Sequence, residues 1–168
     1  MNRNKISENS RRASLQKGSG LVEILVAVFI ITIILGSLVA VASMYLSNAK
    51  ESLRSTQAAY LASEGIEAVK TIRDTSWDNI TALVNGTDYY LYFDNNLSVW
   101  KATTTKSSIG GFSRILNISS VYRDSNYRII LSGGTIDTNT KKVTAYVSWN
   151  TKNSTTTKYI STYITNFN

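Results

Sequence analysis

The sequence contains no cysteine, no histidine and no proline, and each absence excludes certain functions or structures. Without cysteine there is no disulfide framework, no thiol nucleophile and no cysteine-based metal centre. Without histidine the commonest general acid–base group and the commonest transition-metal ligand are both missing. The sequence also contains no nucleotide-binding glycine loop and no pair of catalytic carboxylates. We therefore expect a protein that is not an enzyme and that needs no metal or organic cofactor.

Charged residues are almost absent from one long stretch near the N-terminus. Between Lys17 and Lys50 the one charged side chain is Glu23, and Leu21–Leu46 is otherwise apolar or small. These 26 residues exceed the about 20 that a helix needs to cross a bilayer. A cleaved secretory signal would have a shorter apolar region and a small-residue cleavage site after it. A plain membrane anchor is the other alternative, but a carboxylate inside a membrane span is costly and tends to mark function.

The net charge of +7 is concentrated before this apolar stretch. Residues 1–18 hold five basic side chains and one acidic side chain, or +4, whereas the other 150 residues hold 13 and 10, or +3. A basic segment before an apolar span predicts that the N-terminus stays in the cytoplasm and that the rest is exported. The charge is thus mainly a signal of membrane orientation.

Residues 17–25 read KGSGLVEIL, at the boundary between the basic segment and the apolar stretch. This motif resembles the type III signal of prepilins and pseudopilins, the subunits of type IV pili, type II secretion systems and competence filaments. The resemblance implies that a prepilin peptidase cleaves between Gly18 and Ser19 and that the new N-terminus at Ser19 is methylated. It also implies that Glu23, at the fifth mature position, pairs with the terminal amine of a neighbouring subunit during assembly. The family usually has Phe or Met at the first mature position, where this chain has Ser19.

The helical pattern continues beyond the apolar stretch. Lys50–Asp74 carries apolar residues at spacings of three and four, which predicts one apolar stripe on a helix. Its members are Leu53, Ala58, Leu61, Ala68 and Ile72, with Ala62, Ile66 and Val69 beside them. A helix from about Gly20 to about Arg73 would be about 80 Å long. Residues 57–77 also resemble the corresponding segment of PilV-type minor pilins.

Three glycine and serine positions in this helix raise separate questions. Gly36 and Ser37 form a candidate flexible point in the apolar half. Gly65 costs about 1 kcal/mol relative to alanine inside a helix. Two explanations are open for Gly65, namely close packing against a strand or a locally loosened helix.

After residue 74 the composition changes to one that favours strands. Serine, threonine and asparagine supply 39 of the last 94 residues, and eight of the ten tyrosines lie there. β-Branched and aromatic residues, separated by turn-forming residues, predict six strands of an antiparallel sheet with one face buried against the helix. The candidate strands are Tyr89–Phe93, Leu97–Thr103, Phe112–Tyr122, Tyr127–Leu131, Val143–Trp149 and Lys158–Thr165.

Two groups of polar residues in this part are candidates for binding. Asp88, Asp94 and Asp137 could bind calcium, but their spacing does not match a calcium loop, so solvated turns are the better interpretation. Five basic side chains could form a DNA-binding face, although a scattered solvated surface is the simpler alternative; they are Arg114, Arg123, Arg128, Lys141 and Lys142.

Together these patterns predict an α+β protein, in which a long N-terminal helix packs on a small C-terminal antiparallel β-sheet domain. Residues 1–18 would be a cleaved cytoplasmic leader, 19–46 a transmembrane and filament-core helix, 47–74 its amphipathic continuation, and 75–168 an extracytoplasmic β-rich domain. The resemblance implies a minor pilin or pseudopilin that begins as a single-pass cytoplasmic-membrane protein and ends in an extracellular or periplasmic filament. Its partners would be other pilin subunits, the prepilin peptidase and the inner-membrane assembly platform. The alternatives are a competence-type minor pilin that binds DNA at the filament tip and a membrane-anchored surface protein that does not assemble.

Overall fold

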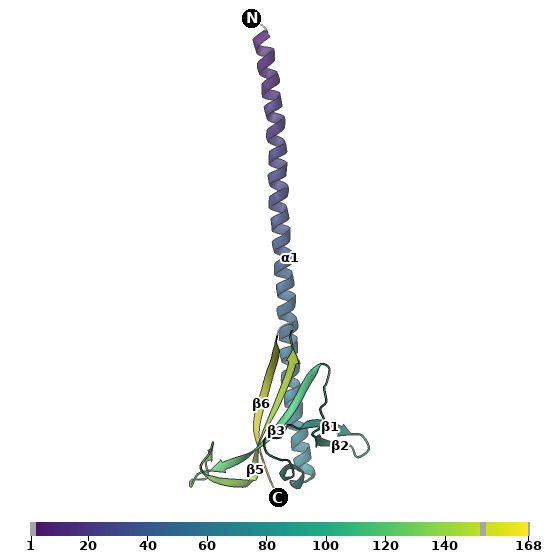
Figure 1. Ribbon diagram of the computed structural model, residues 1–168, viewed down its shortest axis with the longest axis vertical. Coiled ribbons are helices and arrows are strands. Elements are labelled where there is room, and N and C mark those ends of the chain that lie inside the picture. Colours follow the sequence, from purple (N-terminus) through teal and green to yellow (C-terminus); the bar gives the residue numbers. More distant parts are fainter. Residues whose placement is uncertain (1–2, 152–153, 168) are drawn as a thin grey trace. The chain divides into compact units, whose positions relative to one another are not determined.

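The described part of the chain folds into one very long helix, one short helix and six strands. The computed structural model describes the backbone of residues 3–151 and 154–167 and, within these ranges, the side chains from Gly20 onward. The elements are α1 (Arg3–Thr75), α2 (Asp78–Thr81), β1 (Tyr90–Asp94), β2 (Val99–Thr103), β3 (Phe112–Arg123), β4 (Ile129–Ile130), β5 (Thr135–Asn150) and β6 (Thr155–Thr165) (Figure 1). This arrangement confirms the predicted α+β class. The chain divides after Glu51 into two compact units, which are described separately.

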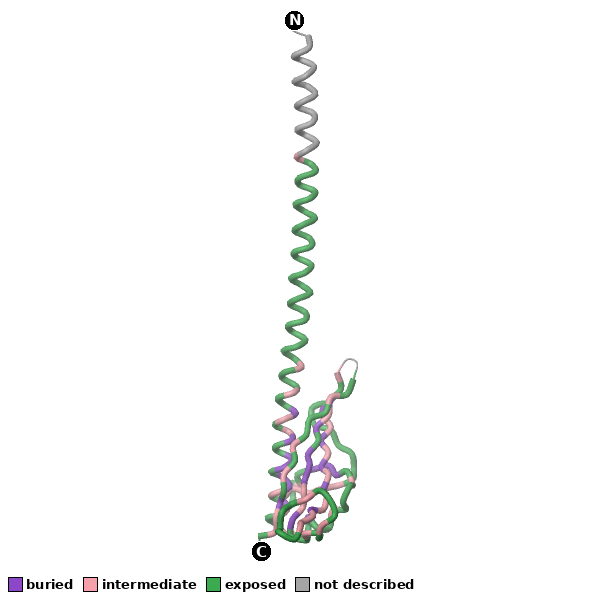
Figure 2. Tube along the Cα trace, turned by 90° about the vertical axis from the view of Figure 1, so that its left-hand side faces the viewer, coloured by how far each residue is buried: buried purple, intermediate pink, exposed green. Residues whose placement is uncertain are grey.

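The first unit consists of the N-terminal part of α1. Every side chain from Leu21 to Lys50 is exposed (Figure 2), and the helix is long and apolar enough to cross a membrane. The predicted start near Gly20 is too late, because α1 begins at Arg3. Gly18 and Gly20 lower the stability of a helix but do not end it. A proline would end it, and the chain has none.

The second unit contains two antiparallel sheets. Four strands pair in the order β4–β3–β5–β6, and β1 and β2 form a separate two-stranded hairpin. An isolated bridge between Tyr89 and Leu116 connects the segment before β1 to β3. The sequence predicts a single sheet, but β1 pairs along its length with β2, so these two strands form a second sheet.

The core of the second unit lies between the last turns of α1 and one face of the four-stranded sheet. Alternate residues are buried from Phe112 to Ile118 in β3, and the inward residues predicted in Val143–Trp149 of β5 are all buried, with Thr144 buried as well. Figure 2 shows this buried layer between the helix and the strands. From α1 it contains Ala58, Ala62, Ile66, Val69 and Ile72, and from the sheet Leu116, Ile118, Val143, Ala145, Val147 and Trp149.

Gly65 belongs to this contact. A Cβ atom at Gly65 would lie 3.2 Å from Cδ of Arg114 and 3.6 Å from both Cβ of Ala145 and Cδ2 of Leu116. The first of the two explanations is thus correct, because the helix approaches β3 and β5 so closely that a larger side chain would have to displace Arg114.

Several predicted boundaries are wrong for local reasons. Leu53 is 60 % exposed and does not belong to the buried stripe. The fourth strand contains two residues instead of five, because Tyr127 has a positive φ of 60° and the Asp124 side chain accepts hydrogen bonds from the backbone of Asn126 and Arg128. The fifth strand begins eight residues earlier than predicted. Its pairing with β3 shifts between Ser120 and Val121, and this irregularity hides the alternation there.

Candidate functional site

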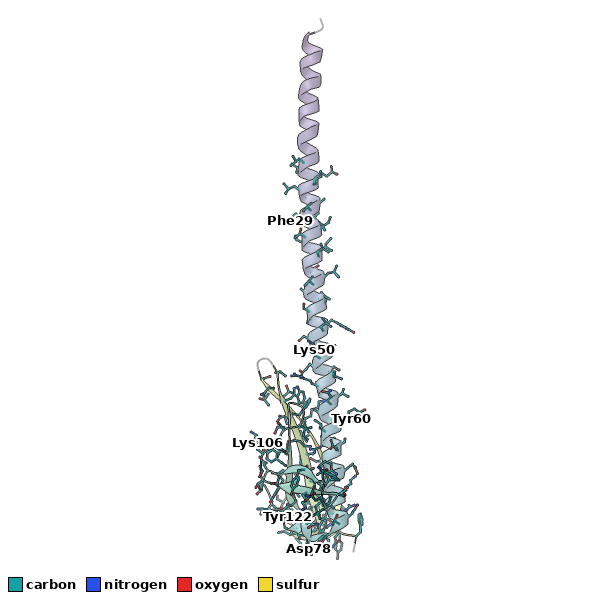
Figure 3. The ribbon with its side chains drawn as sticks, turned by 90° about the vertical axis from the view of Figure 1, so that its right-hand side faces the viewer. Phe29, Lys50, Tyr60, Asp78, Lys106 and Tyr122 are labelled. Atoms are coloured by element: carbon teal, nitrogen blue, oxygen red, sulfur yellow. The ribbon has the colours of Figure 1, made fainter. Side chains whose placement is uncertain are left out.

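The apolar surface of α1 carries one carboxylate. Glu23 is exposed and belongs to none of the ion pairs between described residues. Residues at helical spacing from Leu21 form one continuous side of this stretch, apolar except for Thr32, and Figure 3 labels Phe29 on it. This side consists of Leu21, Ile24, Leu25, Val28, Phe29 and Thr32. A surface of this kind is stable only when lipid or other apolar helices cover it.

Two hydroxyl groups in the same stretch are satisfied within the helix. The Thr32 hydroxyl donates to the Val28 carbonyl at 2.8 Å, and the Ser37 hydroxyl donates to the Ile34 carbonyl at 2.8 Å. These groups need no partner from outside the helix. The carboxylate of Glu23 differs, because a charge in an apolar environment needs a partner of opposite charge to offset the cost of desolvation.

Two other predicted positions lie around Glu23. The side chain of Ser19 lies outside the described residues, as does the environment of Gly18, so both are known only as positions on the α1 backbone. Ser19 is one helical turn before Glu23. The candidate flexible point at Gly36 and Ser37 lies within uninterrupted α-helix, and nothing lies within 4 Å of a Cβ built on Gly36. Its flexibility remains a prediction.

Arg114 is buried between α1 and the sheet, which contradicts its predicted place on a basic surface. Its side chain is 2 % exposed, and Nη1 lies 3.1 Å from Oε2 of Glu64 and donates to the Leu61 carbonyl at 3.2 Å. The guanidinium lies over the Trp100 ring at 5.8 Å. Its Nε is a buried donor with no partner among the described residues. Arg114 thus joins α1, β2 and β3 at the cost of burying a charge.

Arg123 has a similar structural role at the other end of β3. Its Nε donates to Oδ2 of Asp137 at 2.6 Å, and its Nη1 donates to the Tyr127 carbonyl at 2.8 Å. Hydrogen bonds from Arg123 and then Thr140 hold the pKa of the Asp137 carboxyl below its ordinary value, with burial opposing them. The contact fixes the turn before β4 and the irregular part of β5. Arg123 is therefore occupied and does not contribute a free cation to a ligand.

The candidate basic face and the candidate calcium ligands, for which solvated positions were the favoured interpretation, do not come together as sites in the described part of the chain. Of the remaining basic residues, Lys141 and Lys142 are consecutive in β5 and point to opposite faces of the sheet. Asp94 pairs with Lys101 at 2.8 Å, and hydrogen bonding to that ammonium lowers the pKa of the Asp94 carboxyl. No group of three acidic side chains among the described residues is placed to hold a metal ion.

The chain was compared with protein-family models, with curated proteins and with solved structures, and none of the three comparisons gave a match. The functional argument therefore depends on the residues and geometry described above.

Proposed function

We propose that this chain is a subunit of a type IV pilus-like filament, of the minor pilin or pseudopilin kind. A prepilin peptidase removes residues 1–18, and the subunit polymerises through the apolar part of α1. The observation that carries the proposal is Glu23, the one charged side chain between Lys17 and Lys50, on a stretch of α1 whose apolar side chains are exposed. The basic residues before it and Gly18, five positions before Glu23, support the same function.

Polymerisation explains both the exposed apolar side chains of this part of α1 and the carboxylate of Glu23 among them. In the membrane, lipid covers the apolar side chains; in the filament, the helices of neighbouring subunits replace the lipid. Glu23 then meets the terminal amine of the next subunit, and the pair offsets the cost of burying either charge alone. Because misaligned neighbours would leave the carboxylate unpaired, this pair selects one axial register of assembly.

The Glu23→Leu variant distinguishes an effect on filament assembly from an effect on cleavage of the leader. We expect the variant to be inserted and cleaved normally, because the cleavage site is unchanged. It should be at least tenfold depleted from sheared filaments, because the terminal amine of the neighbouring subunit would be buried without its partner, which costs about 3–5 kcal/mol. The measurement is immunoblotting of membrane and filament fractions from cells that express the assembly machinery.

Glu67→Leu is the matched control, because it makes the same substitution on the exposed surface of α1. Glu67 is 68 % exposed and pairs with Lys70 at 2.7 Å, and surface pairs of this kind contribute little. This control should enter filaments like the unchanged chain. Normal incorporation of the Glu23→Leu variant would contradict the proposed role of the carboxylate.

A further inference from the structure

The edge of the four-stranded sheet is formed by β6, and no strand among the described residues pairs with its free side. β6 is the last strand in the order β4–β3–β5–β6, and Figure 1 shows it at the border of the sheet. It pairs with β5 from Asn150↔Thr155 to Thr140↔Thr165 without a register shift. In an antiparallel ladder the backbone groups alternate in direction, so about half of those in β6 point away from β5.

This edge has few of the features that normally prevent strand addition. Proteins protect long edge strands with proline, bulges, charged side chains or a covering element. β6 has neither proline nor a bulge, and Lys158 is its one charged residue. Its other residues are threonine, serine, tyrosine and isoleucine, most of which favour strands. On the face away from the core, five side chains are exposed and Thr165 is half-buried; the exposed ones belong to Thr155, Thr157, Tyr159, Ser161 and Tyr163.

We propose that β6 is an interaction surface for a second copy of this chain, whose own β6 adds to the edge in an antiparallel, two-fold arrangement centred on Ser161. The free N–H and C=O groups of one strand are complementary to those of another extended backbone. A two-fold contact uses the same patch on both copies, so β6 alone supplies both halves of the interface.

Two tyrosines specify this register. With Ser161 at the centre, Tyr159 of each copy lies opposite Tyr163 of the other, on the outer face of the joined sheet. Cross-strand aromatic pairs of this kind stabilise antiparallel strands. Tyr159 already packs against Tyr146 of β5, with ring centroids 5.8 Å apart. The pairing therefore continues an existing row of tyrosines across the interface.

The single charge of β6 favours the same register. A two-fold pair centred on Lys158 would place two ammonium groups directly opposite each other, which destabilises paired strands. With Ser161 at the centre, each Lys158 lies opposite Ile164, which carries no charge, so the two ammonium groups are kept apart.

The pairing has a consequence for the orientation of the two copies. In Figure 1, β6 and the part of α1 within the second unit extend along a common direction, so a two-fold pair sets the two helices antiparallel. The second units of the two copies therefore run in opposite directions along the joined strands. The pairing does not depend on the proposed polymerisation through the apolar helix.

Because the chain contains no cysteine, a single introduced cysteine reports the contact without background. We would oxidise full-length Ser161→Cys in detergent micelles and measure disulfide-linked dimer on non-reducing gels. The two Cα atoms at position 161 would be about 4.5–5.5 Å apart, within the range that a disulfide allows. The matched control is Thr155→Cys, exposed on the same strand, whose two cysteines would be about 40 Å apart in this register.

We expect Ser161→Cys to cross-link at least tenfold faster than Thr155→Cys. Equal rates, or no cross-linking of either, would overturn the proposal, because collisions between micelles do not distinguish the two positions. The cross-linking result does not depend on cleavage at Gly18 or on filament incorporation. Either proposal can therefore be refuted while the other stands.

A mixture of two variants tests the register independently of position 161. Tyr159→Cys mixed with Tyr163→Cys should give a mixed dimer, because these residues are opposite each other and the second Tyr159–Tyr163 pair remains. Neither variant alone should form a dimer efficiently, since the two cysteines introduced at position 159 would be about 13 Å apart along the strands, as would those at position 163. Dimers of either variant alone in amounts equal to the mixed dimer would refute the Ser161-centred pairing.

Discussion

Glu64→Gln is the substitution that tests the buried Arg114 contact most sharply. The substitution removes the negative charge beside a guanidinium that is 2 % exposed and leaves neutral acceptors next to it, the introduced amide oxygen and the Leu61 carbonyl. Loss of one partner from a fully buried ion pair costs about 3–5 kcal/mol. Because the Glu64 side chain is 50 % exposed, water screens part of the interaction. We therefore expect the free energy of unfolding of the second unit to fall by about 1–3 kcal/mol.

The same substitution should have almost no effect when Arg114 is methionine. Arg114→Met removes the buried charge and the unpartnered Nε together, and it keeps a long apolar side chain against Trp100. Replacement of a buried ionic group by an apolar one of similar volume is often near neutral, so Arg114→Met alone should change stability by less than about 1.5 kcal/mol. In that background Glu64→Gln is an ordinary surface substitution, with an expected effect within about 0.5 kcal/mol. The double-mutant cycle should therefore give a coupling energy of about 1–3 kcal/mol.

Urea titration of the full-length protein in detergent micelles measures these differences. All three tryptophans, Trp77, Trp100 and Trp149, lie in the second unit, so their fluorescence reports its unfolding without a contribution from the apolar helix. Glu67→Gln is the control and should change stability by less than about 0.5 kcal/mol. An equal cost of Glu64→Gln in both backgrounds would refute the coupling between Glu64 and the buried charge.

Three further predictions use the same titration. Gly65→Leu should lower stability by at least about 1–3 kcal/mol through overpacking, whereas Ser63→Leu, at an exposed neighbouring position, should leave it within about 0.5 kcal/mol; equal costs would show that Gly65 is not closely packed. Ile118→Ala should cost about 2–5 kcal/mol and Leu131→Ala, at a 94 % exposed residue, almost nothing; the reverse order would contradict the described core. Since folding lowers the pKa of Asp137, its contribution to stability is complete above the unfolded-state pKa of about 3.9 and is lost as the pH falls through the folded-state value. Asp137→Asn should thus weaken the acid-side loss of stability, and an unchanged pH profile would exclude that contribution.

The sequence predicts the elements of this fold better than their ends and their pairing. The apolar run, the helical spacing after Lys50 and the alternation in Val143–Trp149 each have a period that identifies the element. The early part of β5 has no such alternation, because the pairing of β5 with β3 shifts between Ser120 and Val121. Leu53 matches the helical spacing and still lies outside the core, because periodicity does not show where the sheet stops covering the helix.

The positions of the charged side chains were harder to predict. Charge alone suggests that Arg114 is on the surface, yet Phe112, Arg114, Leu116 and Ile118 have the same parity in one strand and share its buried face. This shared parity is the feature of the sequence that indicates that Arg114 is buried. The partner Glu64 could not be identified in the same way, because the contact between α1 and β3 depends on tertiary packing. The free edge of β6 likewise requires the strand order, which local sequence patterns do not specify.

The central claim is that this chain is processed and assembled as a pilin, and the mass of the mature protein tests it most directly. Intact-mass spectrometry on protein from cells that contain a prepilin peptidase should show a chain that begins at Ser19, with or without one methyl group. Gly18→Leu should block this cleavage, whereas Gly20→Ala, at a position with nothing within 4 Å, should leave it unchanged. A protein that retains Met1 and the whole basic segment under these conditions would contradict the account.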